Sequence, residues 1–219
     1  MPETLVSHVA ALLVGTPKPF RGTETSSMAR STATGPVYLD TLGFAGDAVA
    51  DPVNHGGPDK AVHLYPNDHY HWWRDRLDGH ELLDRPGAFG ENLSIEGLTE
   101  DRVHIGDRFR IGEAVVEISH GRAPCWKLDH HFGRRDIVKS VVESGRSGFY
   151  LRVIEAGPVT AGDPVERIAT GDTDWTVVRA FALLIRGEAK RDPGAARALA
   201  DHPALAEEWK ERARGFAER

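Results

Sequence analysis

The feature that most constrains the fold is a change in the character of the chain near residue 170. Before Ile168 the sequence is punctuated by glycine and proline and contains short runs rich in β-branched and aromatic residues. From Asp172 onward it is rich in alanine and charged residues, with apolar residues at helical spacing. We therefore expect two domains, residues 1–170 and 171–219. The first should be mainly β with a few helices, and the second a small all-α domain of three helices.

Five runs in the first part have the length and composition of β-strands. They cover residues 37–39, 61–65, 109–111, 114–119 and 149–154. The third and fourth runs form the clearest hairpin, because each alternates in character and the turn Gly112-Glu113 separates them. This alternation predicts that one face of the hairpin lies in the core and the other in water.

Helical patterns occur in both parts of the chain. In the first part, Asn67 is a candidate N-cap for one helix, and Asp136 opens another that ends before Gly145. In the tail, Asp192-Pro193 is typical of an N-cap and a first turn. The apolar residues on these helices are Tyr70, Trp73, Leu77, Ile137, Val138, Val141, Val142, Trp175, Val178, Phe181, Ala182, Ile185, Leu205, Trp209 and Phe216. A tail this short should dock on the first domain or on a second subunit, which would make a homodimer.

Charge and apolar composition argue against several classes of partner. The 27 Lys and Arg residues against 33 Asp and Glu residues give a net charge of −6, so no overall basic surface serves a nucleic-acid polymer. The apolar stretch at residues 9–14 is far shorter than the ~20 residues that cross a membrane. Glu3 precedes it and no basic segment leads into it, which disfavours a secretory signal. We expect a cytoplasmic protein.

The single cysteine, Cys125, excludes an intramolecular disulfide and a cysteine-rich zinc site. It is either a small buried hydrophobe or a reactive thiol or metal ligand. Arg122 and Lys127 flank it, and nearby cations favour the thiolate that acts as a nucleophile or as a soft-metal ligand. None of the eleven histidines stands in the i, i+4 arrangement, with a glutamate between, that makes a helical zinc site.

A glycine pair, Gly56-Gly57, precedes the strand predicted at residues 61–65 and has two interpretations. In an ordinary loop, the glycines would supply positive φ angles. In a binding loop, they would let backbone N–H groups approach an anion, with His55 and Lys60 supplying positive charge.

Several segments taken in order resemble the MOSC domain. They are Asn54–Ala61, Tyr65-Pro66 with His69-Tyr70, Phe89–Leu93 with Gly97-Leu98, Ile105–Asp107, and Pro124–Leu128. The chain is more closely similar to the bacterial YiiM-like branch, whose members carry a C-terminal three-helix domain. The helical tail from Asp172 matches that domain in position and length, so the resemblance covers nearly the whole chain.

The resemblance implies a MOSC-type β-barrel that binds the molybdenum cofactor, with Cys125 as the ligand of molybdenum. It further implies reduction of N-hydroxylated compounds, such as N-hydroxylated purine bases, to amines. Asn92 would hydrogen-bond near the metal, and Asp59 would orient Lys60 or relay a proton. The residues that would bind or neutralise the cofactor are Arg30, His55, Gly56, Gly57, Lys60, Asn92, Arg122 and Lys127. Arg30 stands where the family pattern has lysine, which keeps the charge but changes the donor geometry.

No motif for flavin, haem or an iron–sulfur cluster is visible, so a reductase of this kind needs a separate electron-donating protein. Two alternatives stay open. In one, Cys125 holds a persulfide and the protein carries sulfur. In the other, the protein is a non-catalytic module that binds the cofactor or a small anion.

Overall fold

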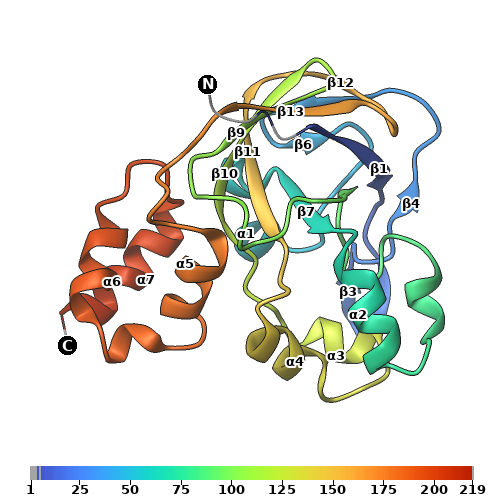
Figure 1. Cartoon of the computed structure of the whole chain (residues 1–219). Coiled ribbons are helices and arrows are strands. Elements are labelled where there is room, and N and C mark those ends of the chain that lie inside the picture. The colour runs from blue at the N-terminus through green and yellow to red at the C-terminus, as the bar shows by residue number, and fades with distance from the viewer. Residues whose placement is uncertain (1–3, 5, 219) are drawn as a thin grey trace.

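The computed structural model describes residue 4 and residues 6–218, and its centre is a closed, seven-stranded mixed β-barrel (Figure 1). Around the barrel the strands follow the order β13 (Pro164–Ala169), β9 (Arg108–Ile111), β10 (Ala114–Gly121), β11 (Phe149–Glu155), β7 (Val62–Pro66), β8 (Leu93–Ile95) and β1 (Val6–Val14). Strand β1 closes the barrel, because it pairs with β8 on one side and with β13 on the other. Neighbours are antiparallel except for β7 and β8.

Smaller elements surround the barrel. The remaining strands are β2 (Lys18–Arg21), β3 (Glu24–Ser26), β4 (Ser31–Thr32), β5 (Val37–Asp40), β6 (Gly43–Phe44) and β12 (Gly157–Val159). The helices are α1 (Pro52–His55), α2 (His69–Arg76), α3 (Lys127–His131), α4 (Ile137–Ser144), α5 (Val177–Leu184), α6 (Pro193–Ala200) and α7 (Glu207–Ala217). Three 3₁₀ turns are η1 (Pro58–Lys60), η2 (Glu81–Asp84) and η3 (Glu188–Lys190). None of the helices described is both long and apolar enough to cross a membrane.

The five predicted strands are confirmed as β5, β7, β9, β10 and β11, and the mainly β fold with a barrel is confirmed with them. Three barrel strands, β1, β8 and β13, were not predicted. Strand β8 is only three residues long and follows a loop motif, so its sequence carries too few positions to show a period of two. Its strand character comes from its partners β7 and β1.

The expectation that one face of the hairpin lies in water is confirmed for β9, where Arg108 is exposed while Phe109 and Ile111 are buried, but it is wrong for β10. Every residue of β10 is buried. One face points into the barrel, and helix α5 and turn η1 pack on this strand. The buried carboxylate of Glu117 is tolerated on this strand because Arg108 and Arg152 each approach it to within 2.8 Å. Tertiary packing, rather than solvent, therefore compensates the polar positions of this strand.

The predicted helices form, with one correction at a helix start. The N-cap of α2 is Asp68 rather than Asn67, whose backbone carbonyl accepts a hydrogen bond from Tyr70 N at 3.1 Å. Helix α4 follows Asp136 and ends at Gly145, which is left-handed with φ of 75°. In the tail, the Asp192 side chain caps α6 by accepting from Ala195 N, as the sequence predicts.

Helices α5–α7, the C-terminal helical unit, pack against the side of the barrel (orange to red in Figure 1). Trp209 and Val177 approach Gly121 so closely that a Cβ there would lie 3.2 and 3.4 Å from them. The backbone N–H of Ala206 also donates to Ser119 O at 3.1 Å. Because the apolar core runs from the barrel into these helices without interruption, the division at residue 170 stays a prediction.

Candidate functional site

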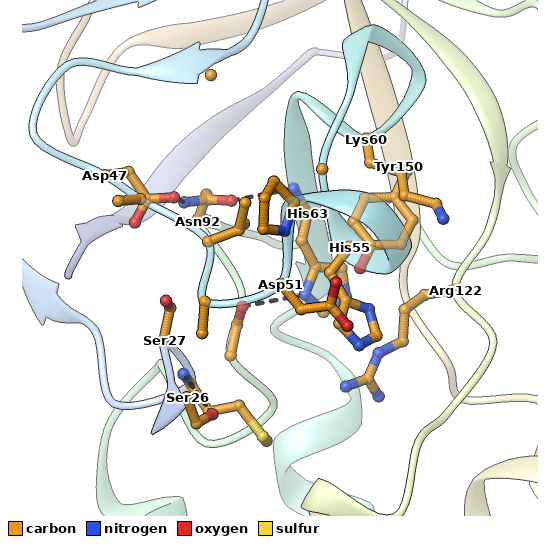
Figure 2. Close-up of a pocket in the computed structure, with 18 of the residues that line it drawn as sticks. Ser26, Ser27, Asp47, Asp51, His55, Lys60, His63, Asn92, Arg122 and Tyr150 are labelled. Carbon is orange, nitrogen blue, oxygen red and sulfur yellow. Dashed lines mark hydrogen bonds between the residues drawn. The ribbon is translucent and has the colours of Figure 1, made fainter. Parts of the chain in front are cut away.

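A cavity of about 320 Å³ opens in the barrel wall, and loops from distant parts of the sequence line it (Figure 2). The residues singled out from the sequence that line it are Arg30, His55, Gly56, Gly57, Lys60, Asn92, Arg122, Cys125 and Lys127. They come from the segment after β3, from α1 and η1, from the loop before β8, and from the loop between β10 and α3 together with the first residue of α3. The fold thus gathers four separate loop motifs around one space.

Asp59 does not line this cavity. Its carboxylate accepts from Arg152 at 2.8 Å, on the side of η1 that faces β11. The carboxylate that contacts the Lys60 ammonium belongs to Glu208 of α7 instead. The structure therefore corrects the expected role of Asp59, which neither orients Lys60 directly nor reaches the cavity to relay a proton there.

The glycine pair satisfies the steric demands of a tight turn. Gly57 has φ of 101°, in the region that favours glycine. A Cβ on Gly56 would lie 2.8 Å from Pro52 O, which is closer than real Cβ atoms approach. Both glycines also line the cavity, so their small size brings the backbone to the cavity surface. The two interpretations of this loop are compatible in the structure.

The four cations at the cavity differ in how completely protein groups engage them. Arg30 donates from Nε and Nη2 to Asp47 at 2.8 Å and from Nη1 to Gly90 O at 2.5 Å, so all three nitrogens are occupied. Lys127 Nζ donates to Thr25 O at 2.8 Å, and Lys60 Nζ binds Glu208.

Arg122 is the least engaged of these cations. It is buried, its Nη2 makes a long 3.4 Å contact with Phe89 O, and its Nη1 has no partner. A buried guanidinium nitrogen without a partner is costly, and an anion in the cavity would satisfy it. Arg122 is therefore the cation best prepared to bind a ligand.

His63 is a cavity residue that sequence reasoning missed. It is buried, and burial, followed by the charge of Arg122, holds its pKa well below the usual value for histidine. Its Nδ1 lies 3.2 Å from Gly90 O, so in the tautomer with the proton on Nδ1 the unpartnered Nε2 is an acceptor. The one available signal was a histidine interrupting the apolar strand pattern at residues 61–65.

Two further residues were missed as individual site residues, Asp47 and Ser27. Asp47 holds Arg30 and also accepts from Asn92 Nδ2 at 3.0 Å. The Ser27 hydroxyl is buried and unpartnered. Three cavity-lining side chains thus carry a buried polar atom without a protein partner: Ser27 Oγ, His63 Nε2 and Arg122 Nη1. Buried polar groups are nearly always paired, so this concentration makes the cavity a candidate ligand site.

Asn92 ties the walls of the cavity together. Its Oδ1 accepts from His63 N at 3.1 Å, and its Nδ2 donates to Leu13 O at 3.2 Å as well as to Asp47. These bonds link the strands β7 and β1 to the segment that carries Asp47. In this structure the amide of Asn92 is therefore engaged in holding the cavity in shape.

Cys125 lies in the loop between β10 and α3 and is only half-buried. Cys125 is therefore not one of the buried core residues. The next residue, Trp126, is exposed, and Arg21 and Lys127 lie 5.8 and 6.0 Å from its ring. Among the described residues, no three His, Cys, Asp or Glu side chains gather into a group that could hold a metal ion.

Comparisons with known proteins agree with this geometry. The model of the MOSC domain matches residues 51–166. YflK of Bacillus subtilis, described as uncharacterized, is 43% identical over 190 residues, which cover 85% of this chain and 82% of YflK. A protein named reductase from Gibberella moniliformis is 32% identical over 194 residues, which cover 81% of this chain but 34% of that protein.

YiiM of Escherichia coli is similar in both sequence and structure. The sequences are 42% identical over 159 residues, which cover 72% of this chain and 70% of YiiM. The crystal structure of Escherichia coli YiiM matches 96% of this chain and 92% of its own with a TM-score of 0.78 and 30% identity. The matched domain includes the glycine loop, His63, Arg122 and Cys125. The chain therefore belongs to the MOSC domain family, in the branch that contains YiiM and YflK.

Proposed function

We propose that this chain is a molybdenum-cofactor-dependent reductase that converts N-hydroxylated compounds, such as N-hydroxylated purine bases, to amines. One observation carries the proposal: a half-buried thiol lines the same cavity as three buried polar atoms that lack protein partners. The relative named reductase supports redox chemistry, although this chain spans only about a third of that protein.

The cavity residues fit the chemistry of such a cofactor. A thiolate at Cys125 is a soft donor suited to molybdenum, and Arg122 Nη1 can donate to a phosphate group. His63 Nε2 can accept from a ring N–H, and the Ser27 hydroxyl can donate or accept. Because the described residues offer no metal cluster, the other ligands of a metal at Cys125 would belong to the cofactor. When bound, the cofactor would supply two-electron redox chemistry.

The reaction consumes two electrons and two protons, and it turns an N–OH group into N–H and water. We propose that the electrons come from a separate reductase protein. His55 lines the cavity, and burial lowers the pKa of its imidazole, which disfavours the protonated form. A proton that reaches this imidazole is therefore readily given up, and His55 can pass it to the leaving hydroxyl oxygen. Arg30 and Asp47 neutralise each other. Asp47 lies on the opposite side of the cavity from Arg122 (Figure 2).

The half-buried thiol also suits the alternative in which Cys125 carries a persulfide. Both proposals are tested on the full chain produced in a host that makes the molybdenum cofactor. Molybdenum and the fluorescent derivative of the pterin are measured per chain, and turnover is followed with an N-hydroxylated purine and an artificial electron donor. Mass spectrometry of the same sample reports an added sulfur atom on Cys125.

The Cys125→Ser variant gives the sharpest comparison. We expect it to keep the melting temperature of the parent chain while losing both molybdenum and turnover, because a serine oxygen is a harder donor than a thiolate. Full turnover in this variant would show that Cys125 is not the metal ligand. A persulfide in the parent protein, without molybdenum or turnover, would favour the sulfur carrier instead.

A further inference from the structure

The C-terminal helical unit reaches the wall of the cavity through one ion pair. Lys60 lines the cavity, and its ammonium donates to Asn54 O at 2.8 Å and pairs with the carboxylate of Glu208. The Lys60 side chain is 11% exposed, whereas that of Glu208 is 62% exposed. A cation of the candidate site thus has its counter-ion on helix α7, 148 residues further along the chain.

Several other bonds fix the first turn of α7 beside this part of the cavity wall. Arg152 donates to Asp59 at 2.8 Å and to Ala204 O at 2.9 Å. The Ser119 hydroxyl donates to Asp59 O at 2.6 Å, and Ser119 O accepts from Ala206 N at 3.1 Å. The turn that carries Asp59 and Lys60 is therefore joined to residues just before Glu208 by bonds that do not involve Lys60.

We propose that Glu208 is a counter-ion supplied by the helical unit, which competes with anions in the cavity for the Lys60 ammonium and so sets the affinity of the site for phosphate groups. The proposal rests on the proposed function for the identity of the anion, a phosphate such as that of the cofactor. It gives the helical unit a direct part in the site and makes Asp59 a positioning residue for the same turn.

The exposures of the two partners explain why Glu208 can act in this way. Lys60 is confined by its loop, whereas the exposed Glu208 carboxylate can turn into solvent when an anion takes its place. Partly exposed ion pairs are weak enough to be exchanged. Removing the carboxylate should tighten phosphate binding roughly fivefold, since about 1 kcal/mol of competition is lost.

The test is a calorimetric titration of the full chain with inorganic phosphate, using protein from a host that cannot make the cofactor. Four proteins form a double-mutant cycle: the parent, Glu208→Gln, Lys60→Gln and the double variant. Glu211→Gln is the matched control, because it removes the same charge from an exposed residue three positions further along α7. Melting temperatures establish that every variant is folded.

We expect Glu208→Gln to bind phosphate roughly fivefold more tightly than the parent, and Glu211→Gln to bind within about twofold of it. In the Lys60→Gln background, the Glu208 substitution should have no effect. The inference is overturned if Glu208→Gln binds no more tightly than Glu211→Gln, or if its effect persists without Lys60. The titration needs neither molybdenum nor turnover, so a failure of the proposed reductase activity is distinguishable from a failure of this coupling.

Discussion

Arg30 and Asp47 form a two-point ion pair in the cavity wall, with Nε–Oδ1 and Nη2–Oδ2 both 2.8 Å. Their side chains are 7% and 9% exposed. Asp47 Oδ1 also accepts from Gly15 N at 2.8 Å, so the pair is anchored to the end of β1. Paired, planar donors and acceptors of this kind make strong and directional contacts. The charge of Arg30 therefore stabilises the wall of the site more directly than it serves a ligand.

The Asp47→Asn substitution should destabilise the protein strongly. It leaves the buried guanidinium of Arg30 without its carboxylate, and breaking a buried pair in this way costs about 3–5 kcal/mol. The free energy of unfolding in urea measures the effect. Glu155→Gln is the control, because its contact with Arg110 is 3.9 Å long and exposed. That change should cost less than about 1 kcal/mol. If the two substitutions lower the free energy of unfolding equally, the Arg30–Asp47 pair stabilises the protein no more than an exposed ion pair does.

The Arg122→Ala substitution should weaken anion binding without a large loss of stability, because its Nη1 has no protein partner to lose. A charged hydrogen bond of about 1.5–3 kcal/mol corresponds to a loss of roughly tenfold to a hundredfold in phosphate affinity. The difference in phosphate affinity between the parent and Arg122→Ala should shrink as the salt concentration rises, because salt screens the attraction between the cations and the phosphate. Calorimetry across ionic strength checks this, with the exposed Arg135→Ala as control. Unchanged affinity in Arg122→Ala would remove Arg122 from the site.

His63 should make the stability depend on pH on the acid side of neutrality. Because burial lowers its pKa in the folded protein, the unfolded chain binds a proton below about pH 6.5 that the folded chain does not. The stabilisation is present above pH 6.5 and is lost as the pH falls toward the lowered value. His63→Gln should therefore reduce the slope of unfolding free energy against pH, by up to about 1.4 kcal/mol per pH unit, on the acid side of about pH 6.5.

Urea unfolding at several pH values measures that slope. The control is His71→Gln, which changes an exposed histidine on α2. An unchanged slope in His63→Gln would mean that His63 binds its proton equally well in the folded and unfolded chain. His120 is also fully buried with a lowered pKa, so part of the pH dependence should survive the loss of His63.

A fragment ending at Thr170 should keep a folded barrel, because the bonds that close the barrel between β1 and β13 all lie before that residue. It should also expose the apolar surface on which Phe181 and Trp209 pack. We expect strand-type circular dichroism, a lower melting temperature than the full chain and binding of a hydrophobic dye. An unfolded fragment would show that barrel and helices fold as one unit. Light scattering on both proteins tests whether the helices form a homodimer interface.

The sequence alone determined the local features of this protein. Alternation around Gly112-Glu113 predicted the hairpin, and the change near residue 170 predicted the helices that follow. The glycine loop and the cations beside Cys125 also singled out segments that line one cavity. These signals are local, because a strand or helix face repeats every two or about 3.6 residues and turn chemistry involves only a few neighbours.

Only the tertiary structure decided how the charges of the site are paired. Asp47 holds Arg30, and Glu208 rather than Asp59 holds Lys60. His63 presents Nε2 as a buried acceptor when its Nδ1 donates a hydrogen bond to Gly90 O. These relationships arise when the barrel closes and α7 docks on it, which brings together residues that no spacing in the sequence relates. The loss of any one of these partners should therefore destabilise the folded protein, because a charge without a partner is far more costly inside the fold than in water.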